Sequence, residues 1–238
     1  MFEETLWNGV RLLQPEDQFR LGTDSVACAA FARFPKGASI ADLGCGSGAL
    51  ALMLLASDPT CHVTGIELQE DAVKTAMENA RINGVYFRVL QGDLREIRTL
   101  LPAGSMDACI ANPPYFPPGS GQTAKGALGQ ARSEATCTLS QLTEAAAWLL
   151  PTGGRFALVH RPERLADLVW ELRRHQLEPK RLQLVRHSIN SPVSLVLLEA
   201  RKGGKPGLRW EQELILHHPD GSPTAQADAI YHRAPRKE

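Results

Sequence analysis

The sequence lacks the features of membrane-spanning, secreted and zinc-binding proteins. No apolar run approaches the roughly 18 residues that a transmembrane helix needs, and Met1-Phe2-Glu3-Glu4 has no basic start with a following apolar stretch. The 5 cysteines are odd in number, scattered and never in C-x-x-C spacing, which argues against both a disulfide framework and a zinc site. The 7 histidines show no metal-ligand spacing. We therefore expect a cytoplasmic protein that binds no metal and no membrane.

An excess of either charge is also absent, although the charge is unevenly distributed. The chain of 238 residues has 26 Lys+Arg and 26 Asp+Glu, which argues against a protein that coats nucleic acid generally. Residues 1–150 hold 11 Lys+Arg against 16 Asp+Glu, whereas residues 151–238 hold 15 against 10. The basic part would help to bind phosphates, and among its cations we select Arg201, Lys202, Lys205 and Arg209. For any single one of them, a solvated surface position is the more frequent role.

A glycine-rich loop between a strand and a helix is present. Ser39–Leu43 has the composition of a buried strand that ends in Asp42 and Leu43, and the glycines Gly44, Gly46 and Gly48 surround Cys45 and Ser47. The helix-forming stretch 49–56 follows. This order is typical of the first unit of a doubly wound α/β fold, in which glycine lets the backbone approach a nucleotide-like ligand.

Two carboxylates follow the next two predicted strands. The strand 63–67 ends in Glu67, about 20 residues after the glycine loop, where a carboxylate can accept hydrogen bonds from ribose hydroxyls. The strand 86–90 is followed by Asp93, for which a helix-capping role before Leu94 is a strong alternative. Ligands of open parallel sheets bind at the carboxyl ends of the strands, so these residues predict one shared site.

A polar turn with two prolines, Asn112-Pro113-Pro114-Tyr115, follows the apolar run 106–111. Proline fixes φ and donates no hydrogen bond, so the carbonyls in this turn are held at set angles and can accept. An NH2 group is the natural ligand of such a turn. An ordinary proline turn with tyrosine at its rim is the alternative for these four residues alone.

Together these motifs resemble a class I S-adenosylmethionine-dependent methyltransferase of the amino-group type. The segments Arg20–Ser25, 112–116, 131–134 and 199–208 are similar to bacterial tRNA adenine-N6 methyltransferases, which modify an adenine beside the anticodon of valine tRNA. Ser133 departs from the histidine of many relatives. The resemblance implies that Glu67 binds the cofactor ribose, that Asp93 lies near the cofactor adenine and that Asn112 lies beside the transferred methyl group.

The resemblance also implies the full set of site residues, a cofactor and an RNA partner. The cofactor is S-adenosyl-L-methionine and the partner a folded tRNA, bound by a monomer or homodimer. The implied cofactor-binding residues are Arg20, Gly22, Thr23, Asp42, Gly44, Cys45, Gly46, Gly48, Glu67, Leu68, Asp93, Leu94 and Asn112. The implied catalytic residues are Asn112, Pro113, Pro114 and Tyr115, and the implied substrate-binding residues are Tyr115, Phe116, Lys125, Arg132, Arg201, Lys202, Lys205 and Arg209.

The rest of the chain completes an α/β fold of one domain. We expect a Rossmann-like sheet of seven strands, mostly parallel, with helices on both faces. Its last two strands, 181–187 and 193–200, form an antiparallel hairpin because their connection is too short for a parallel crossover. We expect residues 1–37 to cover cofactor and substrate, 38–200 to form the core and 201–238 to form an extension. Residues 117–138 have the composition of a long loop that would order on RNA.

Two other functions remain open on the sequence. The same proline turn occurs in enzymes that methylate the side-chain amide of a protein glutamine, as in release factors, because the turn cannot distinguish an aminopurine from an amide. Those enzymes usually carry a separate helical domain before the glycine loop, and here only residues 1–38 precede the first predicted strand. A non-catalytic RNA-binding protein with a methyltransferase fold is the third possibility, and the intact Asn112, Glu67 and glycines argue against it.

Overall fold

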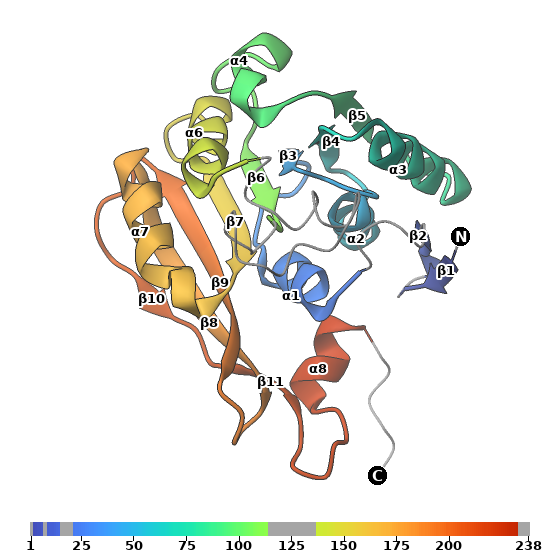
Figure 1. The fold of residues 1–238 in the computed structure, drawn as a ribbon, viewed down its shortest axis with the longest axis vertical. Helices are drawn as coiled ribbons and strands as arrows, with labels where there is room; N and C mark the ends of the chain where they lie inside the picture. Colours follow the sequence, from blue (N-terminus) through green and yellow to red (C-terminus); the bar gives the residue numbers. More distant parts are fainter. Residues whose placement is uncertain (1, 7–8, 15–20, 114–136, 233–238) are drawn as a thin grey trace, which may run out of the picture.

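A mostly parallel β-sheet forms the centre of the computed structural model, which describes residues 2–6, 9–14, 21–113 and 137–232 (Figure 1). The strand order is β10-β8-β9-β7-β6-β3-β4-β5, and β11 also pairs with β8. The strands of this sheet are β3 (Ser39–Leu43), β4 (His62–Glu67), β5 (Arg88–Gln91), β6 (Ala108–Ala111), β7 (Arg155–His160), β8 (Leu177–Ser188), β9 (Val193–Lys202), β10 (Arg209–Trp210) and β11 (Leu214–His217). In the described part of the chain, no helix is both long and apolar enough to span a membrane.

The predicted α/β class and the antiparallel hairpin are confirmed, while the strand count differs. The seven expected strands lie side by side in the sheet, in the order β8-β9-β7-β6-β3-β4-β5. Among them, β9 runs antiparallel to both β7 and β8. Outside them, β10 and β11 both pair in parallel with β8 and extend the sheet to nine strands in the described residues. These two strands have only two and four residues, too few for a period of two to stand out in the sequence.

Two predicted strand bounds were wrong. Tyr86 and Phe87 were expected to begin a strand that starts instead at Arg88, and Tyr86 is exposed. The strand expected from Arg181 begins at Leu177 and contains Pro179, beside which the register of β8 against β9 shifts. Proline is tolerated in a strand at such an irregularity because no regular ladder hydrogen bond is required there.

Helices cover both faces of the sheet, as expected. Alternate residues of one strand pack to opposite sides: Ala157 and Val159 of β7 belong to one buried cluster, and Phe156 and Leu158 to the other. The first face is covered by α1 (Thr23–Phe31), α2 (Ala49–Ser57), α3 (Glu70–Ile82) and α8 (Ala225–Ile230). The second is covered by α4 (Ile97–Leu100), α6 (Leu139–Leu149) and α7 (Leu165–Arg174), with the short 3-10 helices η2 (Leu94–Glu96) and η3 (Pro162–Arg164) preceding α4 and α7.

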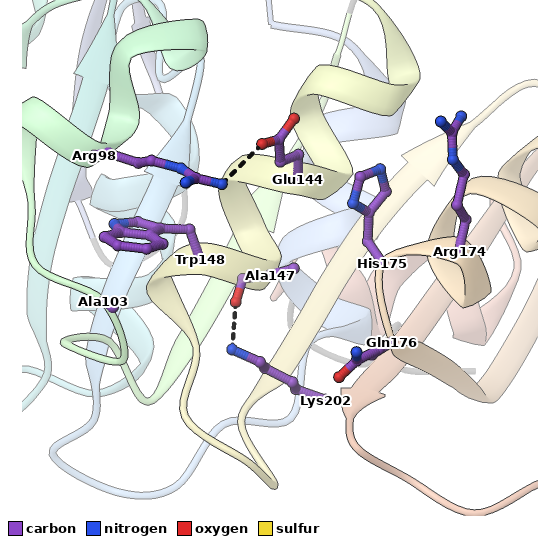
Figure 2. Close-up of a pocket in the computed structure, with 9 residues that line it drawn as sticks. All are labelled: Arg98, Ala103, Glu144, Ala147, Trp148, Arg174, His175, Gln176 and Lys202. Carbon is purple, nitrogen blue, oxygen red and sulfur yellow. Dashed lines mark hydrogen bonds and ion pairs between the residues drawn. The ribbon is translucent and has the colours of Figure 1, made fainter.

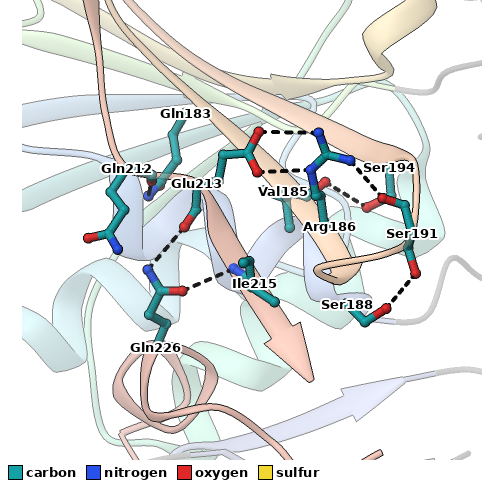
Figure 3. Close-up of polar contacts among 10 residues, drawn as sticks. All are labelled: Gln183, Val185, Arg186, Ser188, Ser191, Ser194, Gln212, Glu213, Ile215 and Gln226. Atoms are coloured by element: carbon teal, nitrogen blue, oxygen red, sulfur yellow. Dashed lines mark hydrogen bonds and ion pairs between the residues drawn. The ribbon is translucent and has the colours of Figure 1, made fainter. Parts of the chain in front are cut away.

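The outer edge of the sheet is closed by side chains from the carboxyl-terminal part of the chain (Figure 3). Gln226 of α8 accepts a hydrogen bond from the Ile215 amide at 3.1 Å and donates to the Glu213 carbonyl at 3.0 Å. Arg186 of β8 forms an ion pair with Glu213 at 2.9 Å. The edge backbone of β11 is thus satisfied locally, and α8 is fixed beside the sheet.

A separate hairpin of β1 (Phe2–Thr5) and β2 (Arg11–Gln14) is attached to α3 by two asparagines. Asn79 and Asn83 each accept a hydrogen bond from a backbone amide of β2 and donate to the carbonyl of the same residue, Leu13 and Arg11 respectively. The two asparagines are four residues apart, and their partners on the strand are two residues apart. Both spacings correspond to about 6 to 7 Å, so each asparagine lies opposite its partner. Asn79 also donates to the Ser47 carbonyl at 2.9 Å, which links this hairpin to the glycine loop.

Candidate active site

Three neighbouring parallel strands bring the predicted site residues to one edge of the sheet. Asp42 of β3 is in register with Gly65 of β4 on one side and with Ile110 of β6 on the other. The glycine loop after β3 therefore lies between Glu67, which ends β4, and Asn112, which follows β6. This arrangement confirms the expected meeting of strand ends, and it places a ligand site where open α/β sheets have one.

The glycine loop has open space at its first two glycines. Gly44 and Gly46 have φ values of +75° and +53°, and a Cβ added to either would meet nothing within 4 Å. At Gly48, with φ of +81°, a Cβ would lie 2.6 Å from Cζ of Phe87. The buried Cys45 side chain packs against Gly65, where a Cβ would lie 2.6 Å from the Cys45 sulfur. The first two glycines thus leave room for a ligand, while the rest of the loop packs into the protein.

Glu67 holds the glycine loop and retains further acceptor capacity. Its carboxylate accepts a hydrogen bond from the Gly46 amide at 2.9 Å and, through the other oxygen, one from the Gln69 amide at 2.9 Å. Because a carboxylate has about four acceptor positions, Glu67 can also accept from hydroxyl groups of a ligand. The next residue, Leu68, is 42% exposed and offers an apolar surface at the same edge.

Asp42 is a fully buried carboxylate with no hydrogen-bond partner for either side-chain oxygen among the described residues. Burial and then repulsion from Glu67 raise the pKa of Asp42 to about 7, and the Ala51 amide, whose contact with the carboxylate falls short of hydrogen-bond geometry, opposes this rise only weakly. An unpaired buried carboxylate is costly unless a ligand compensates it. Behind the open loop, the buried negative charge of Asp42 therefore favours a ligand that places a positive charge nearby, such as an ammonium group.

Asp93 acts as a cap for the following 3-10 helix. Its carboxylate accepts from the Arg95 amide at 2.9 Å and from the Arg95 guanidinium at 2.8 Å, and these contacts lower the pKa of Asp93. The alternative capping role is therefore confirmed. The expected contacts of Asp93 and Leu94 with a cofactor adenine stay predictions.

Asn112 reaches helix α1 directly. Its side-chain nitrogen donates a hydrogen bond to the Ser25 hydroxyl at 2.8 Å, and Pro113 follows half-buried at the end of β6. The predicted site residues Arg20, Pro114, Tyr115, Phe116, Lys125 and Arg132 lie outside the described residues. Asn112 and Pro113 thus represent the proline turn in the described part of the chain.

Sequence reasoning missed the role of α1 and of the carboxyl-terminal helix in building this edge. Gly22 is the N-cap of α1, and the Thr23 hydroxyl lies 3.1 Å from the Tyr231 hydroxyl, just after α8. The segment 20–25 was noted only through its resemblance to methyltransferases. A helical pattern in residues 23–31 was the local signal, whereas nothing near Tyr231 in the sequence indicates its contact with Thr23.

The structure does not bring the four selected basic residues together with Asn112. Arg201 pairs with Arg155 at the start of β7, whereas Ala111, next to Asn112, pairs with Leu158 farther along the same strand. Because β9 runs antiparallel to β7, Arg201 and Lys202 lie toward the amino ends of the parallel strands, and Arg209 of β10 is separated from β6 by β8, β9 and β7. The four basic residues therefore lie apart from the catalytic turn, and their expected contact with RNA phosphates stays a prediction.

Lys202 is engaged within the protein. Its ammonium group donates to the carbonyls of Ala147 and Leu150 at 2.5 and 2.6 Å, at the carboxyl end of α6, where cations stabilise a helix. Figure 2 shows the contact of Lys202 with Ala147. The pocket there has a volume of about 540 Å3, and Arg98, Glu144 and Trp148 also line it. No group of three or more His, Cys, Asp or Glu side chains in the described ranges could hold a metal ion.

Comparison with known proteins identifies the family of this chain. The chain belongs to the methyltransferase small domain family, whose model matches residues 23–169. It is 34% identical to a tRNA1(Val) (adenine(37)-N6)-methyltransferase of Tolumonas auensis, over 90% of each chain. It is 32% identical to the enzyme of that name from Porphyromonas gingivalis, over 85% of this chain and 83% of the relative. A predicted O-methyltransferase from Agrobacterium tumefaciens has the same fold, with a TM-score of 0.72, 19% identity and coverage of 90% and 100%.

Proposed function

We propose that this protein transfers a methyl group from S-adenosylmethionine to the N6 amino group of an adenine in tRNA, next to the anticodon. The observation that carries the proposal is the placement of Asn112 and Pro113 directly beside the open glycine loop and the unpaired Asp42 carboxylate. The relatives share about a third of their residues with this chain over most of its length, and their names support tRNA adenine as the acceptor.

Residues at the carboxyl ends of β3 and β4 would hold the cofactor. When bound, S-adenosylmethionine supplies a methyl group on a positively charged sulfur: an amino nitrogen can bond to the methyl carbon as the carbon–sulfur bond breaks, which leaves S-adenosylhomocysteine. The open space at Gly44 and Gly46 would accommodate its amino acid part, close to the buried negative charge of Asp42. Glu67 would accept from its ribose hydroxyls, and the exposed Leu68 would pack against its adenine.

The proline turn would activate and orient the acceptor nitrogen. In free adenine, the lone pair of this nitrogen is delocalised into the ring, so the nitrogen is a poor nucleophile. The Asn112 side-chain oxygen and the Pro113 carbonyl would each accept one of its N–H groups, which favours tetrahedral geometry and holds the nitrogen in line for attack. No strong base is required, because the methylated amino cation loses its proton readily to water.

The RNA must present an unstacked base. A base in the anticodon loop costs less to extrude than one within a duplex, and Tyr115 and Phe116 would stack on it. We propose that the protein acts on tRNA in the cytoplasm. It would act as a single domain, either as a monomer or as a homodimer. Lys125 and Arg132 would contact the RNA close to the turn, whereas residues 201–209 could reach only a distant part of the same large molecule.

The test uses purified protein, labelled S-adenosylmethionine and a total cell extract. We expect acid-precipitable label that ribonuclease destroys and protease does not, followed by N6-methyladenosine in digested tRNA. Asn112→Ala should lower kcat at least about 100-fold while the cofactor Kd stays within several-fold, because Asn112 acts mainly in the transition state. Label that only protease destroys would overturn the RNA proposal and indicate methylation of a protein amide.

A further inference from the structure

We propose that Ser25 of α1 is a positioning residue that fixes the side-chain amide of Asn112 with its oxygen toward the acceptor amino group. This inference rests on the proposed function and adds a residue to its machinery. Ser25 and Asn112 are separated by 87 positions in sequence, and the Ser25 hydroxyl accepts the Asn112 side-chain N–H at 2.8 Å.

The contact is built into the packing of α1 against the end of β6. Ser25 is only 6% exposed, so its hydroxyl is held within the protein. One helical turn later, the Cys28 thiol lies 3.7 Å from the Ala111 carbonyl, directly before Asn112. Residues three apart share a helix face, so one face of α1 contacts two successive residues where β6 ends.

The start of α1, just before Ser25, is itself held by side-chain contacts. The Ser25 amide donates to the Asp24 carboxylate at 2.8 Å, and the Thr23 hydroxyl lies 3.1 Å from that of Tyr231. The hydroxyl that Asn112 meets is therefore carried on a fixed helix terminus. Such support is what a functional side chain needs to keep one geometry.

An asparagine amide needs such a partner because its two ends have opposite hydrogen-bonding character. Rotation by about 180° exchanges an acceptor oxygen for an NH2 donor of nearly the same shape. An acceptor amino group brings N–H donors, so it is held only by the oxygen, and the rotated amide would oppose it. A serine hydroxyl can bond either end of the amide, so the contact with Ser25 holds the Asn112 side chain in place, and the orientation in the structure, with the nitrogen on Ser25, is the one that turns the oxygen toward the acceptor.

The first test compares Ser25→Ala with Ser25→Thr, using tRNA methylation under saturating substrates. We expect Ser25→Ala to lower kcat roughly tenfold, the effect of one hydrogen bond, with an unchanged cofactor Kd and a small decrease in melting temperature. Ser25→Thr keeps the hydroxyl and should restore kcat to within about threefold. Ser57→Ala is the matched control, since it removes a helix hydroxyl that bonds only the Met53 carbonyl at the far end of α2, and it should leave kcat unchanged.

A double-mutant cycle separates positioning from general packing. If Ser25 acts through Asn112, then Ser25→Ala should cause no further loss of kcat in the Asn112→Ala background. Additive losses, or a Ser25→Ala protein as active as wild type, would overturn the role of Ser25. A wild-type protein that methylates no RNA would instead overturn the proposed function itself, so the two failures are distinguishable.

Discussion

Replacing Asp42 by asparagine should stabilise the ligand-free protein above pH 7 and weaken cofactor binding at the same time. Asp42 is fully buried, and neither of its carboxylate oxygens has a partner in the described residues. Its pKa is raised from 3.8 to about 7, chiefly by burial and then by Glu67. At about 1.4 kcal/mol per pKa unit, keeping Asp42 ionised in the folded protein costs on the order of 4 kcal/mol.

The pH dependence of this cost has a definite sign. Below pH 4 the carboxyl is protonated in both folded and unfolded protein, so it has no effect. Between about pH 4 and pH 7 the unfolded chain has lost the proton that the folded protein keeps, and the free energy of unfolding therefore falls as the pH rises. Above pH 7 the full cost applies. Asparagine cannot ionise, so the variant lacks this decline.

Urea denaturation of both ligand-free proteins from pH 5 to pH 8 measures the effect. The difference in unfolding free energy, Asp42→Asn minus wild type, should grow by about 2 to 3 kcal/mol over this range. Any fixed effect of the new amide shifts the difference equally at all pH values and leaves its slope unchanged. Parallel stability curves would refute the reasoning.

Calorimetric titration with S-adenosylmethionine completes the experiment. An ionised Asp42 beside a cationic ligand predicts that wild-type affinity decreases as the pH falls below about 7, by up to about tenfold per pH unit. The asparagine variant should bind more weakly at pH 8 and show no such dependence. Wild-type affinity that is independent of pH, with an unchanged Kd in the variant, would exclude Asp42 from the cofactor site.

Three further variants test other parts of the fold. Glu67→Ala removes an acceptor for the glycine loop and should raise the cofactor Kd at least about tenfold, whereas an unchanged Kd in calorimetry would assign the ribose to another group. Lys202→Met should lower the unfolding free energy by about 1 to 3 kcal/mol in urea denaturation and leave the salt dependence of RNA binding unchanged; a flatter dependence would show that Lys202 contacts phosphate. Gly48→Ala should cost about 2 kcal/mol or more because of Phe87, against a smaller loss for Gly84→Ala, which has open space at a similar φ; equal melting temperatures would contradict the clash.

Local sequence patterns were sufficient for the parts of the fold that depend on short-range order. A buried strand, a glycine loop and a helix can be recognised within about 20 residues, and β3 and β7 have the predicted bounds. The meeting of Gly44, Glu67 and Asn112 also followed, because consecutive parallel strands end at one edge. The short connection after Ser188 fixed the β8–β9 hairpin as antiparallel.

The sequence carried one consequence that was overlooked. An antiparallel β9 returns the chain to the amino ends of the parallel strands, so Arg201 and Lys202 had to lie away from Asn112. The excess of basic residues in 151–238 could not show this, because a count of charges does not say at which end of the strands they lie. Lys202 in particular resembles any surface cation in sequence, and only the position of α6 makes it a helix cap.

Sequence by itself determined the class of fold, the edge that carries the site and the residue types suited to bind a cofactor and an amino group. Tertiary structure decided how those residues are oriented and what supports them: Ser25 beside Asn112, Tyr231 beside Thr23 and an Asp42 carboxylate with no hydrogen-bond partner among the described residues. The physical reason is that strand and turn preferences arise from neighbouring residues. Contacts between distant segments arise instead when helices pack on the two faces of the sheet, and this packing leaves no pattern in the chain between those segments.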